Sequence, residues 1–247
     1  MRSVRNQIIS IAGFDPSGGA GILADIKTFE QIGVYGFGVV TSVTYQNDQK
    51  FDGGLWLDFK EITAQFQLLA ERWKFGFAKI GFVESADMLR KIVIMLKNHN
   101  PEIKIIWDPI METSSGVLIH ESDFVDEAAD VIANLYMVTP NMEEAKILGL
   151  VDMISKTNVL VTGGQIEESL STDILYSDGK TFRFDAKKLE NQDKHGSGCV
   201  MSAAITAFLS MGNSIEASCE KAKEYTLQFL LSSPELLGFH YAIGINE

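Results

Sequence analysis

The stretch that decides the fold is IISIAGFDPSGGAGILADIKTFEQIG, which covers residues 8–33. Its first four residues, 8–11, form a short apolar run that is typical of a buried strand and that leads into a glycine-rich turn. Hydrophobic residues then recur at helical spacing, at Ile22, Leu23, Ile26, Phe29 and Ile32, until Gly33 ends the pattern. The stretch therefore predicts a strand, a turn and a helix, which is the first unit of an α/β fold.

The alternation of strand and helix continues outward from this unit. Further strands are expected at residues 39–44, 78–80, 103–107, 136–139 and 159–162, with helices around residues 62–73, 89–96, 124–132 and 143–148. A hairpin over residues 174–177 and 182–184, turned at Asp178-Gly179, and two long helices over about residues 199–211 and 214–231 complete the pattern. Because no linker or internal repeat interrupts it, we expect one domain over residues 1–247, with three layers (α/β/α) and a mainly parallel central sheet flanked by helices.

Charge and cysteine content narrow the classes of function. The 247 residues carry 21 Lys and Arg against 33 Asp and Glu, which is a net charge of −12. Nucleic-acid and anionic-membrane surfaces bind largely through phosphate neutralisation, so this balance argues against both and favours a small-molecule partner. The two cysteines show no metal-binding spacing, and no apolar stretch approaches the roughly 20 residues of a membrane-spanning helix. We therefore expect a cytoplasmic protein.

Three turns that follow expected strands are candidates for a ligand site, because open α/β sheets bind ligands at the carboxyl ends of their strands. The first turn covers residues 13–21 and contains four glycines, which let the backbone approach a ligand closely. Its spacing matches neither the Walker motif nor the dinucleotide-binding motif. A turn that serves geometry alone is the alternative.

The second turn offers carboxylates. Asp108 ends an apolar strand just before Pro109, where it could organise Mg²⁺ or act only as a turn residue. Farther along, Asn141 is placed to cap a helix with Glu144 at the third helical position, which is the spacing of a capping box. Capping alone would explain this pair, and only the neighbouring Asp108 makes Glu144 a candidate metal carboxylate.

The third turn is Gly196-Ser197-Gly198-Cys199, at the start of an apolar helix. Small residues there expose backbone N–H groups at the positive end of the helix dipole, which predicts an anion site. A thiolate of Cys199 would be stabilised at this place and could accept a proton from a substrate hydroxyl. The alternative is that Cys199 is a small buried hydrophobic residue.

Taken together, these motifs resemble those of the hydroxymethylpyrimidine/phosphomethylpyrimidine kinases, which are thiamine-biosynthesis members of the ribokinase superfamily. The N-terminal signature lies at residues 11–29. The remaining motifs follow in the family's order at residues 33–36, 44–47, 79–81, 108–111, 139–141, 163–164 and 195–199. The similarity thus spans nearly the whole chain.

The resemblance implies a ribokinase-like fold, a homodimer and a reaction. ATP with Mg²⁺ would phosphorylate the hydroxymethyl group of the aminopyrimidine and then the resulting monophosphate. Cys199 would be the base, and Gly196, Ser197 and Gly198 would form the anion hole. The implied pyrimidine pocket comprises Gly13, Asp25, Gln46, Phe82 and Ile110, with Asp25 and Gln46 suited to hydrogen-bond the pyrimidine edge. Nucleotide contacts map to Asn141, Thr162, Gly164 and Lys194, and the metal to Asp108 and Glu144.

The departures from the family pattern are also informative. Thr162 stands where the family usually carries a Lys that contacts an ATP phosphate, and we expect Lys194, which replaces a Thr, to restore part of that charge. Phe82 replaces the usual Met against the pyrimidine, and residues 149–158 are too few for the usual full helix. Two alternatives therefore stay open: a pyridoxal kinase, and a catalytically weakened pyrimidine-binding regulatory protein.

Overall fold

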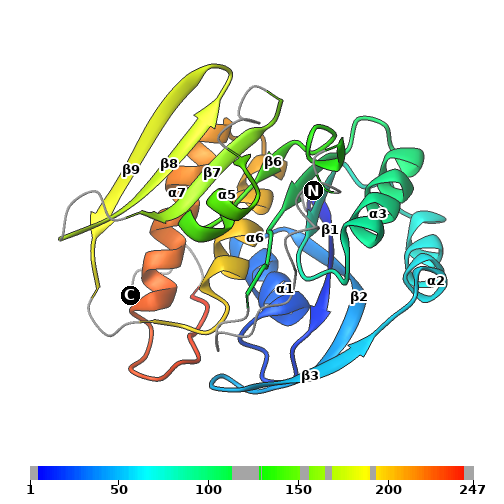
Figure 1. Cartoon of the computed structure of the whole chain (residues 1–247), viewed down its shortest axis with the longest axis horizontal. Coiled ribbons are helices and arrows are strands. Elements are labelled where there is room, and N and C mark those ends of the chain that lie inside the picture. The colour runs from blue at the N-terminus through cyan, green and yellow to red at the C-terminus, as the bar shows by residue number, and fades with distance from the viewer. Residues whose placement is uncertain are drawn as a thin grey trace.

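The computed structural model describes residues 5–112, 128, 130–150, 156–164, 169–189 and 193–241. Its centre is a nine-stranded sheet in the order β3-β2-β1-β4-β5-β6-β7-β8-β9 (Figure 1). The strands are β1 (Gln7–Phe14), β2 (Tyr35–Gln46), β3 (Phe51–Trp56), β4 (Phe77–Ile80), β5 (Lys104–Trp107), β6 (Met137–Val138), β7 (Asn158–Gly164), β8 (Leu170–Ser177) and β9 (Lys180–Lys187). The helices are α1 (Gly21–Ile32), α2 (Phe59–Ala70), α3 (Ala86–His99), α5 (Met142–Ile147), α6 (Ser197–Ser210) and α7 (Ile215–Leu230).

The middle of the sheet is parallel and both of its edges are antiparallel. Strands β2, β1, β4, β5, β6 and β7 pair in parallel, while β3 pairs antiparallel with β2, and β8 and β9 extend the other edge antiparallel from β7. The carboxyl ends of all parallel strands therefore meet at one edge of the sheet, where the three candidate turns lie.

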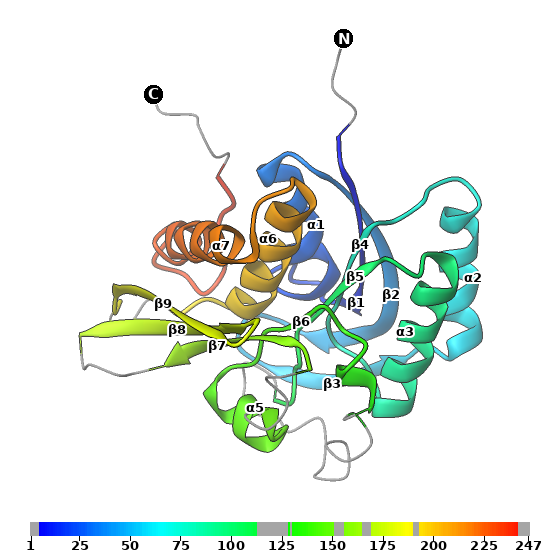
Figure 2. The ribbon, with the colours of Figure 1, turned by 90° about the horizontal axis from the view of Figure 1, so that it is seen from above.

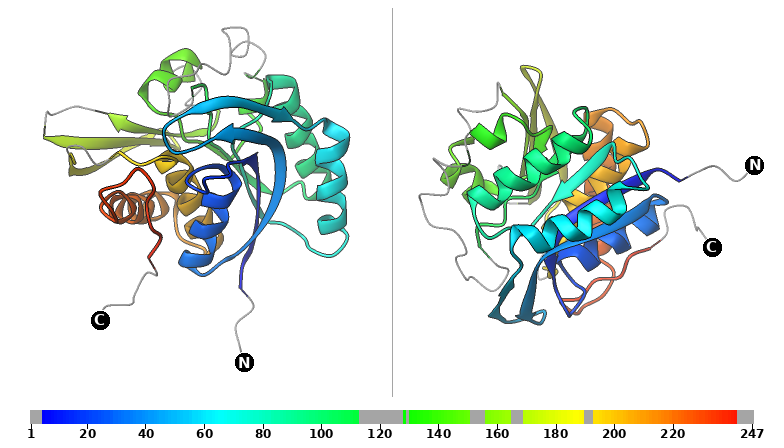
Figure 3. Two further views of the ribbon diagram at one scale, coloured as in Figure 1. Left: turned by 90° about the horizontal axis from the view of Figure 1, so that it is seen from below. Right: turned by 90° about the vertical axis from the view of Figure 1, so that its right-hand side faces the viewer.

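Helices cover both faces of the sheet. Helices α1, α6 and α7 lie on one face, and α2 and α3 lie on the other (Figures 2 and 3). The alternation of side chains along β1 serves both cores, because Ile9 and Ile11 pack in the core under α2 and α3 whereas Ile8 packs in the core under α6 and α7. The expected three-layer α/β/α architecture is confirmed.

Local sequence signals explain most of the helix boundaries. Helix α2 begins with a capping box between Asp58 and Glu61, and α1 ends at Gly33, whose φ of 96° favours glycine. Helix α6 differs from the other helices in its burial, because 11 of its 14 residues are buried. It has the apolar sequence needed at a position between the sheet, α1 and α7.

Two expectations about secondary structure need comment. Strand β3 was not predicted, because Phe51–Trp56 contains Asp52 and two glycines and lacks the alternation of a typical strand. The helix expected around residues 124–132 lies mostly outside the described residues, although residues 128 and 130–132 are helical. The other expected strands and helices are present, as is the Asp178-Gly179 turn, where both residues have positive φ. Within the described part of the chain, every helix is too short or too polar to span a membrane.

Candidate active site

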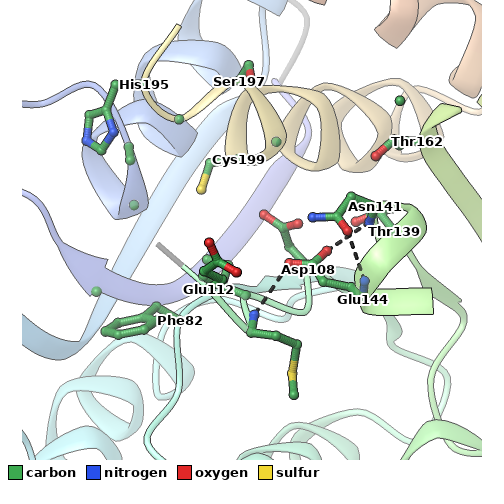
Figure 4. Close-up of a pocket in the computed structure, with 18 of the residues that line it drawn as sticks. Phe82, Asp108, Glu112, Thr139, Asn141, Glu144, Thr162, His195, Ser197 and Cys199 are labelled. Atoms are coloured by element: carbon green, nitrogen blue, oxygen red, sulfur yellow. Dashed lines mark hydrogen bonds between the residues drawn. The ribbon is translucent and has the colours of Figure 1, made fainter. Parts of the chain in front are cut away.

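The three turns surround one cavity of about 580 Å³ at the carboxyl edge of the sheet (Figure 4). Most of the predicted site residues line it: Gly13, Gln46, Phe82, Asp108, Ile110, Asn141, Glu144, Thr162, Gly196, Ser197, Gly198 and Cys199. Asp25, Gly164 and Lys194 are not among its lining residues. The cavity thus unites segments that are up to about 180 residues apart in the chain, as the fold class predicts.

Two of the turns interlock backbone to backbone. Gly196 and Gly21 both have positive φ values, of 77° and 58°. A Cβ atom at Gly196 would overlap the carbonyl oxygen of Gly19, and one at Gly21 would overlap that of Gly13. Glycine is therefore required at 196 and 21 for two reasons, conformation and space.

A buried side-chain pair joins the same two turns. Nε2 of His195 lies 2.9 Å from Oδ2 of Asp15, and both side chains are almost fully buried. Asp15 also accepts hydrogen bonds from Ser17 and from the backbone N–H of Ala20. Burial opposes the charged form of Asp15, but the hydrogen bonds from His195, Ser17 and Ala20 outweigh it and hold the pKa of Asp15 below its usual value. Sequence reasoning missed Asp15, although it lies within the glycine-rich motif.

The third turn presents a helix N-terminus to the cavity. Helix α6 begins after Gly196, and no side chain of the described residues caps its first N–H groups. Those N–H groups and the helix dipole form the expected surroundings for an anion. Ser197, Gly198 and Cys199 all belong to the first turn of α6 and line the cavity.

The thiol of Cys199 is held protonated in this structure. Burial raises its pKa to about 12, whereas the charge of Lys79 and the backbone N–H of Gly21 lower it. Asp108 and Asp25 raise it further. The stabilised thiolate expected from the position of Cys199 at the helix start is therefore not what the electrostatics favour, because burial outweighs the helix terminus.

Two carboxylates line the cavity, one beside α6 and one on α5. Asp108 follows β5, and its Oδ2 lies 3.1 Å from the hydroxyl of Ser202. Glu144 forms the expected capping box with Asn141, and its other oxygen accepts a hydrogen bond from the N–H of Met111 (Figure 4). Burial is the main cause that raises the pKa of Glu144 to about 7. Glu112 also lines the cavity and was missed, although it directly follows the motif of Asp108.

These carboxylates fit a magnesium ion. They do so as a pair, because the described residues contain no cluster of three or more His, Cys, Asp or Glu that could hold a metal ion without other ligands. Magnesium is commonly held by one or two carboxylates together with water and substrate phosphates, and Asp108 and Glu144 provide such a pair.

An aromatic wall closes the opposite side of the cavity. The ring of Phe82 lies 4.6 Å from that of Trp56 and 6.4 Å from that of Phe51, measured between centroids. Phe82 and Phe51 both line the cavity, next to Gln46 at the end of β2. Phe51 and Trp56 lie on the unpredicted strand β3, and for this reason sequence reasoning missed them.

The structure places three expected contact residues outside the cavity. Asp25 is fully buried and pairs with Nζ of Lys79 at 2.7 Å, so it does not present its carboxylate to a pyrimidine. Lys194 donates to the carbonyl oxygen of Ser233 at 2.8 Å and is 6% exposed, so its charge is used in the fold rather than in the cavity. Gly164 pairs with Thr172 in the β7–β8 ladder.

The charge of the cavity wall is strongly negative. Among its described lining residues, none is Lys or Arg, and His195 is the basic side chain. The acidic lining residues are Asp108, Glu112, Glu143 and Glu144. Residues 113–127, 151–155, 165–168 and 190–192, which border this region in sequence, also contain no Lys or Arg. The charge that Thr162 fails to supply is therefore not replaced by another lining residue of the described segments.

The family model described as phosphomethylpyrimidine kinase matches residues 15–243 of this chain. The chain belongs to the phosphomethylpyrimidine kinase family. It is therefore an enzyme, a kinase that transfers a phosphoryl group to a small molecule. The match covers all three turns of the cavity except the first residues of the glycine-rich motif.

Individual relatives agree with this assignment. A hydroxymethylpyrimidine/phosphomethylpyrimidine kinase of Aquifex aeolicus is 31% identical over 245 residues, which cover 92% of this chain and 95% of the relative. The crystal structure of a phosphomethylpyrimidine kinase from Clostridium difficile 630 is 30% identical, with a TM-score of 0.75 over 91% of this chain and 99% of the other. A pyridoxal kinase of Bacillus subtilis, solved as an ADP complex, is 25% identical, with a TM-score of 0.84 over 98% and 100%. The ribokinase-like fold is thus confirmed.

Proposed function

We propose that this kinase uses ATP and Mg²⁺ to phosphorylate the hydroxymethyl group of 4-amino-5-hydroxymethyl-2-methylpyrimidine, and then the resulting monophosphate, in thiamine biosynthesis. The observation that carries this proposal is the uncapped N-terminus of α6, which lines the same cavity as an aromatic wall and two carboxylates. The names of the relatives support the choice of substrate.

The aminopyrimidine fits the side of the cavity formed by Phe82, Ile110 and Gln46. A flat heterocycle would pack on the ring of Phe82, which is itself held against Trp56. The amide of Gln46 offers both a donor and an acceptor to the ring nitrogen and amino group. In this orientation the hydroxymethyl group would point toward Cys199.

Phosphoryl transfer would take place at the start of α6. The hydroxymethyl oxygen attacks the γ-phosphorus of ATP, the bond to the bridging oxygen breaks, and ADP leaves with that oxygen. The hydroxyl proton passes to the sulfur of Cys199 in its thiolate form. The N–H groups of Gly196, Gly198 and Cys199 would bind the oxygens of the transferred group, whose charge is greatest during transfer. Magnesium, held by Asp108 and Glu144, would neutralise part of the phosphate charge.

Nucleotide binding is proposed next to Asn141 and Thr162, which lie on the α5 and β7 side of the cavity. The ADP complex of the Bacillus subtilis pyridoxal kinase supports a nucleotide site in this fold. Because the described lining has no Lys or Arg, we propose that bound cations neutralise most of the triphosphate charge.

We further propose a cytoplasmic homodimer. Val43 and Leu55 form a cross-strand pair on β2 and β3, and both side chains are exposed, as is the nearby Tyr45. An apolar patch on a two-stranded edge of a sheet offers a surface against which a second copy of the chain would pack.

One experiment tests the proposed reaction. The protein is incubated with Mg-ATP and, separately, with the aminopyrimidine, its monophosphate or pyridoxal, and ADP release and product mass are followed. We expect turnover of the first two substrates. Pyridoxal kinase activity is the second candidate, favoured by the structural similarity to the Bacillus subtilis enzyme. Tight pyrimidine binding without turnover would replace both readings with a regulatory one.

A further inference from the structure

A buried ion pair lies behind the part of the cavity wall that the end of β7 forms. It joins Asp173 on β8 to Lys223 on α7, with 2.8 Å between Nζ of Lys223 and Oδ2 of Asp173. The side chain of Asp173 is 4% exposed and that of Lys223 is 11% exposed. Neither residue lines the cavity, so the pair is not part of the site described above.

The other oxygen of the same carboxylate reaches the cavity wall. Oδ1 of Asp173 accepts a hydrogen bond of 2.9 Å from the backbone N–H of Gly163. Gly163 and its neighbour Thr162 both line the cavity. Because both oxygens of Asp173 are engaged, Lys223 fixes the orientation in which the carboxylate meets the N–H of Gly163.

The strand is irregular at the point where Asp173 binds it. The pairing of β7 with β8 shifts register between Val161 and Gly164, and Gly163 has a φ of 70°. Such a bulge leaves a residue unpaired in the ladder, and a side-chain acceptor can take the place of the missing backbone partner. Asp173 is this acceptor. On the other side, the N–H of Thr162 donates to the carbonyl oxygen of Pro140 at 2.9 Å, so the bulge is held from both sides.

We propose that Asp173 is a positioning residue for the nucleotide, which holds the bulge at Thr162 and Gly163 in the shape that binds ATP, and that Lys223 orients its carboxylate. The inference rests on the proposed function only in placing the nucleotide beside Thr162. It assigns a role to two residues that are far from the cavity in sequence and do not line it.

The sign of the effect distinguishes positioning from charge. The described cavity wall has acidic side chains and no Lys or Arg, and Asp173 adds a negative charge directly behind it. If the ion pair acted through its charges alone, loss of Asp173 would favour a bound triphosphate, and loss of Lys223 would disfavour it. Positioning predicts the opposite result for Asp173, because the wall loses the group that shapes it.

Two double variants isolate the hydrogen bond to Gly163. Asp173→Asn with Lys223→Met keeps an acceptor oxygen for the N–H of Gly163, whereas Asp173→Ala with Lys223→Met removes it. Both variants lose one charge of each sign, so the net charge stays at −12 and no buried charge is left without its partner. The measured quantities are the dissociation constant of Mg-ADP by calorimetry, without heterocycle, and the KM values for ATP and the pyrimidine.

The variant with Asn should keep the dissociation constant of Mg-ADP and the KM for ATP within about twofold of the unmodified protein. The variant with Ala should raise both on the order of tenfold, since one hydrogen bond no longer holds the wall. The KM for the pyrimidine should change little in either variant, because Gln46 and Phe82 belong to other parts of the wall. The single variant Asp173→Ala should also weaken Mg-ADP binding, although it removes a negative charge.

Ser177→Ala is the matched control for a general loosening of the two strands. The hydroxyl of Ser177 on β8 donates to Oδ1 of Asn158 on β7 at 2.7 Å, and neither residue lines the cavity. This substitution therefore removes another buried hydrogen bond between the same strands, away from the bulge. It should lower the midpoint of denaturant unfolding and leave Mg-ADP binding unchanged. Equal weakening of Mg-ADP binding by Ser177→Ala would overturn the inference.

Two further outcomes would overturn it. The first is the same Mg-ADP affinity in the two double variants, and the second is tighter Mg-ADP binding by Asp173→Ala, which would assign the effect to charge. If the double variant with Ala does not fold, Asp173→Val with Lys223→Met takes its place, because Val suits a strand and also lacks the acceptor.

Failure of the proposed function gives a separate result. An unmodified protein that binds Mg-ADP but does not phosphorylate the pyrimidine contradicts the proposed substrate, and the calorimetric comparison of the variants still decides the role of Asp173. An unmodified protein that does not bind Mg-ADP overturns the proposed nucleotide site and this inference together.

Discussion

At the scale of single residues, the site depends on a buried cysteine whose thiol stays protonated at neutral pH. Cys199 is 6% exposed, lies at the start of α6 and lines the cavity. The same burial that positions the thiol also keeps its proton in place at neutral pH. Mutation of Cys199 and the pH dependence of turnover therefore provide two independent tests of the assignment of Cys199 as the general base.

Replacement of Cys199 by Ala should lower kcat by on the order of 10²–10⁴-fold, because it removes the general base and leaves the anion hole in place. The measurement is kcat from ADP release with Mg-ATP and the pyrimidine. Cys219→Ala is the control, since Cys219 is also buried but lies on α7. Full activity in Cys199→Ala would show that this side chain only fills space.

Turnover should rise with pH across the range from about 7 to 9.5. Burial raises the pKa of Cys199 to about 12, so the thiolate that accepts the substrate proton increases with pH throughout this range. Below the pKa, the logarithm of kcat should increase by about one per pH unit as long as proton transfer limits the rate. A profile of kcat that is flat from pH 7 upward would contradict the assignment of Cys199 as base.

Substitution of Thr162 by Lys should improve nucleotide binding. Thr162 lines a cavity whose described wall lacks Lys and Arg, so a new ammonium group there would give the phosphate oxygens a cationic side chain that this wall does not otherwise provide. One charge-assisted hydrogen bond corresponds to about 1.5 kcal/mol, or roughly a tenfold decrease in the KM for ATP. Thr181→Lys on exposed β9 is the control for added charge alone. An equal effect of both variants would assign the change to long-range electrostatics.

At the scale of elements, helix α6 provides a comparison between its own two ends. Gly196 precedes its first turn and Gly212 follows its last, and both have positive φ, of 77° and 88°. A Cβ atom at 212 would meet no atom within 4 Å, whereas one at 196 would overlap the backbone of Gly19. Both positions require a left-handed backbone conformation. Only position 196 is also in close contact with a neighbouring turn.

Gly212→Ala should therefore lower the free energy of unfolding by about 1 kcal/mol, the cost of a left-handed conformation without glycine. Gly196→Ala should lower it by about 3 kcal/mol, because the added overlap forces the two turns apart. Denaturant unfolding measures both values, and only Gly196→Ala should also abolish turnover. Equal destabilisation by the two variants would show that the turns are not closely packed.

The elements were largely predictable from sequence, and the side chains that face the cavity were less so. Strands, helices and turns follow from hydrophobic spacing and glycine positions, whereas β3 escaped because its two glycines weaken the pattern. Asp25 shows the limit of motif comparison. It shares the buried face of α1 with Ile22 and Phe29, at spacings of three and four residues, so helical periodicity already placed it inside the protein. Its partner Lys79 could be found only from the three-dimensional fold.

At the scale of the whole molecule, the exposed patch of Val43, Tyr45 and Leu55 predicts self-association. Leu55→Lys should convert the dimer to a monomer by placing a charge opposite the same position of the second copy. Light scattering coupled to gel filtration measures the mass. Leu68→Lys on α2 is the control, because Leu68 is even more exposed, at 70% against 60% for Leu55. A monomeric unmodified protein would contradict the proposal.

The contact between Asp15 and His195 spans 180 positions in the sequence. A nascent chain therefore presents its glycine-rich turn long before the segment that completes the anion site has been synthesised. Closing so long a loop is slow and carries a large entropy cost, so the early part of the sheet must form without help from that contact. Catalytic competence should thus be among the last properties that the folding chain acquires, because fragments that end before residue 195 lack both the anion site and the helices α6 and α7 that cover one face of the sheet.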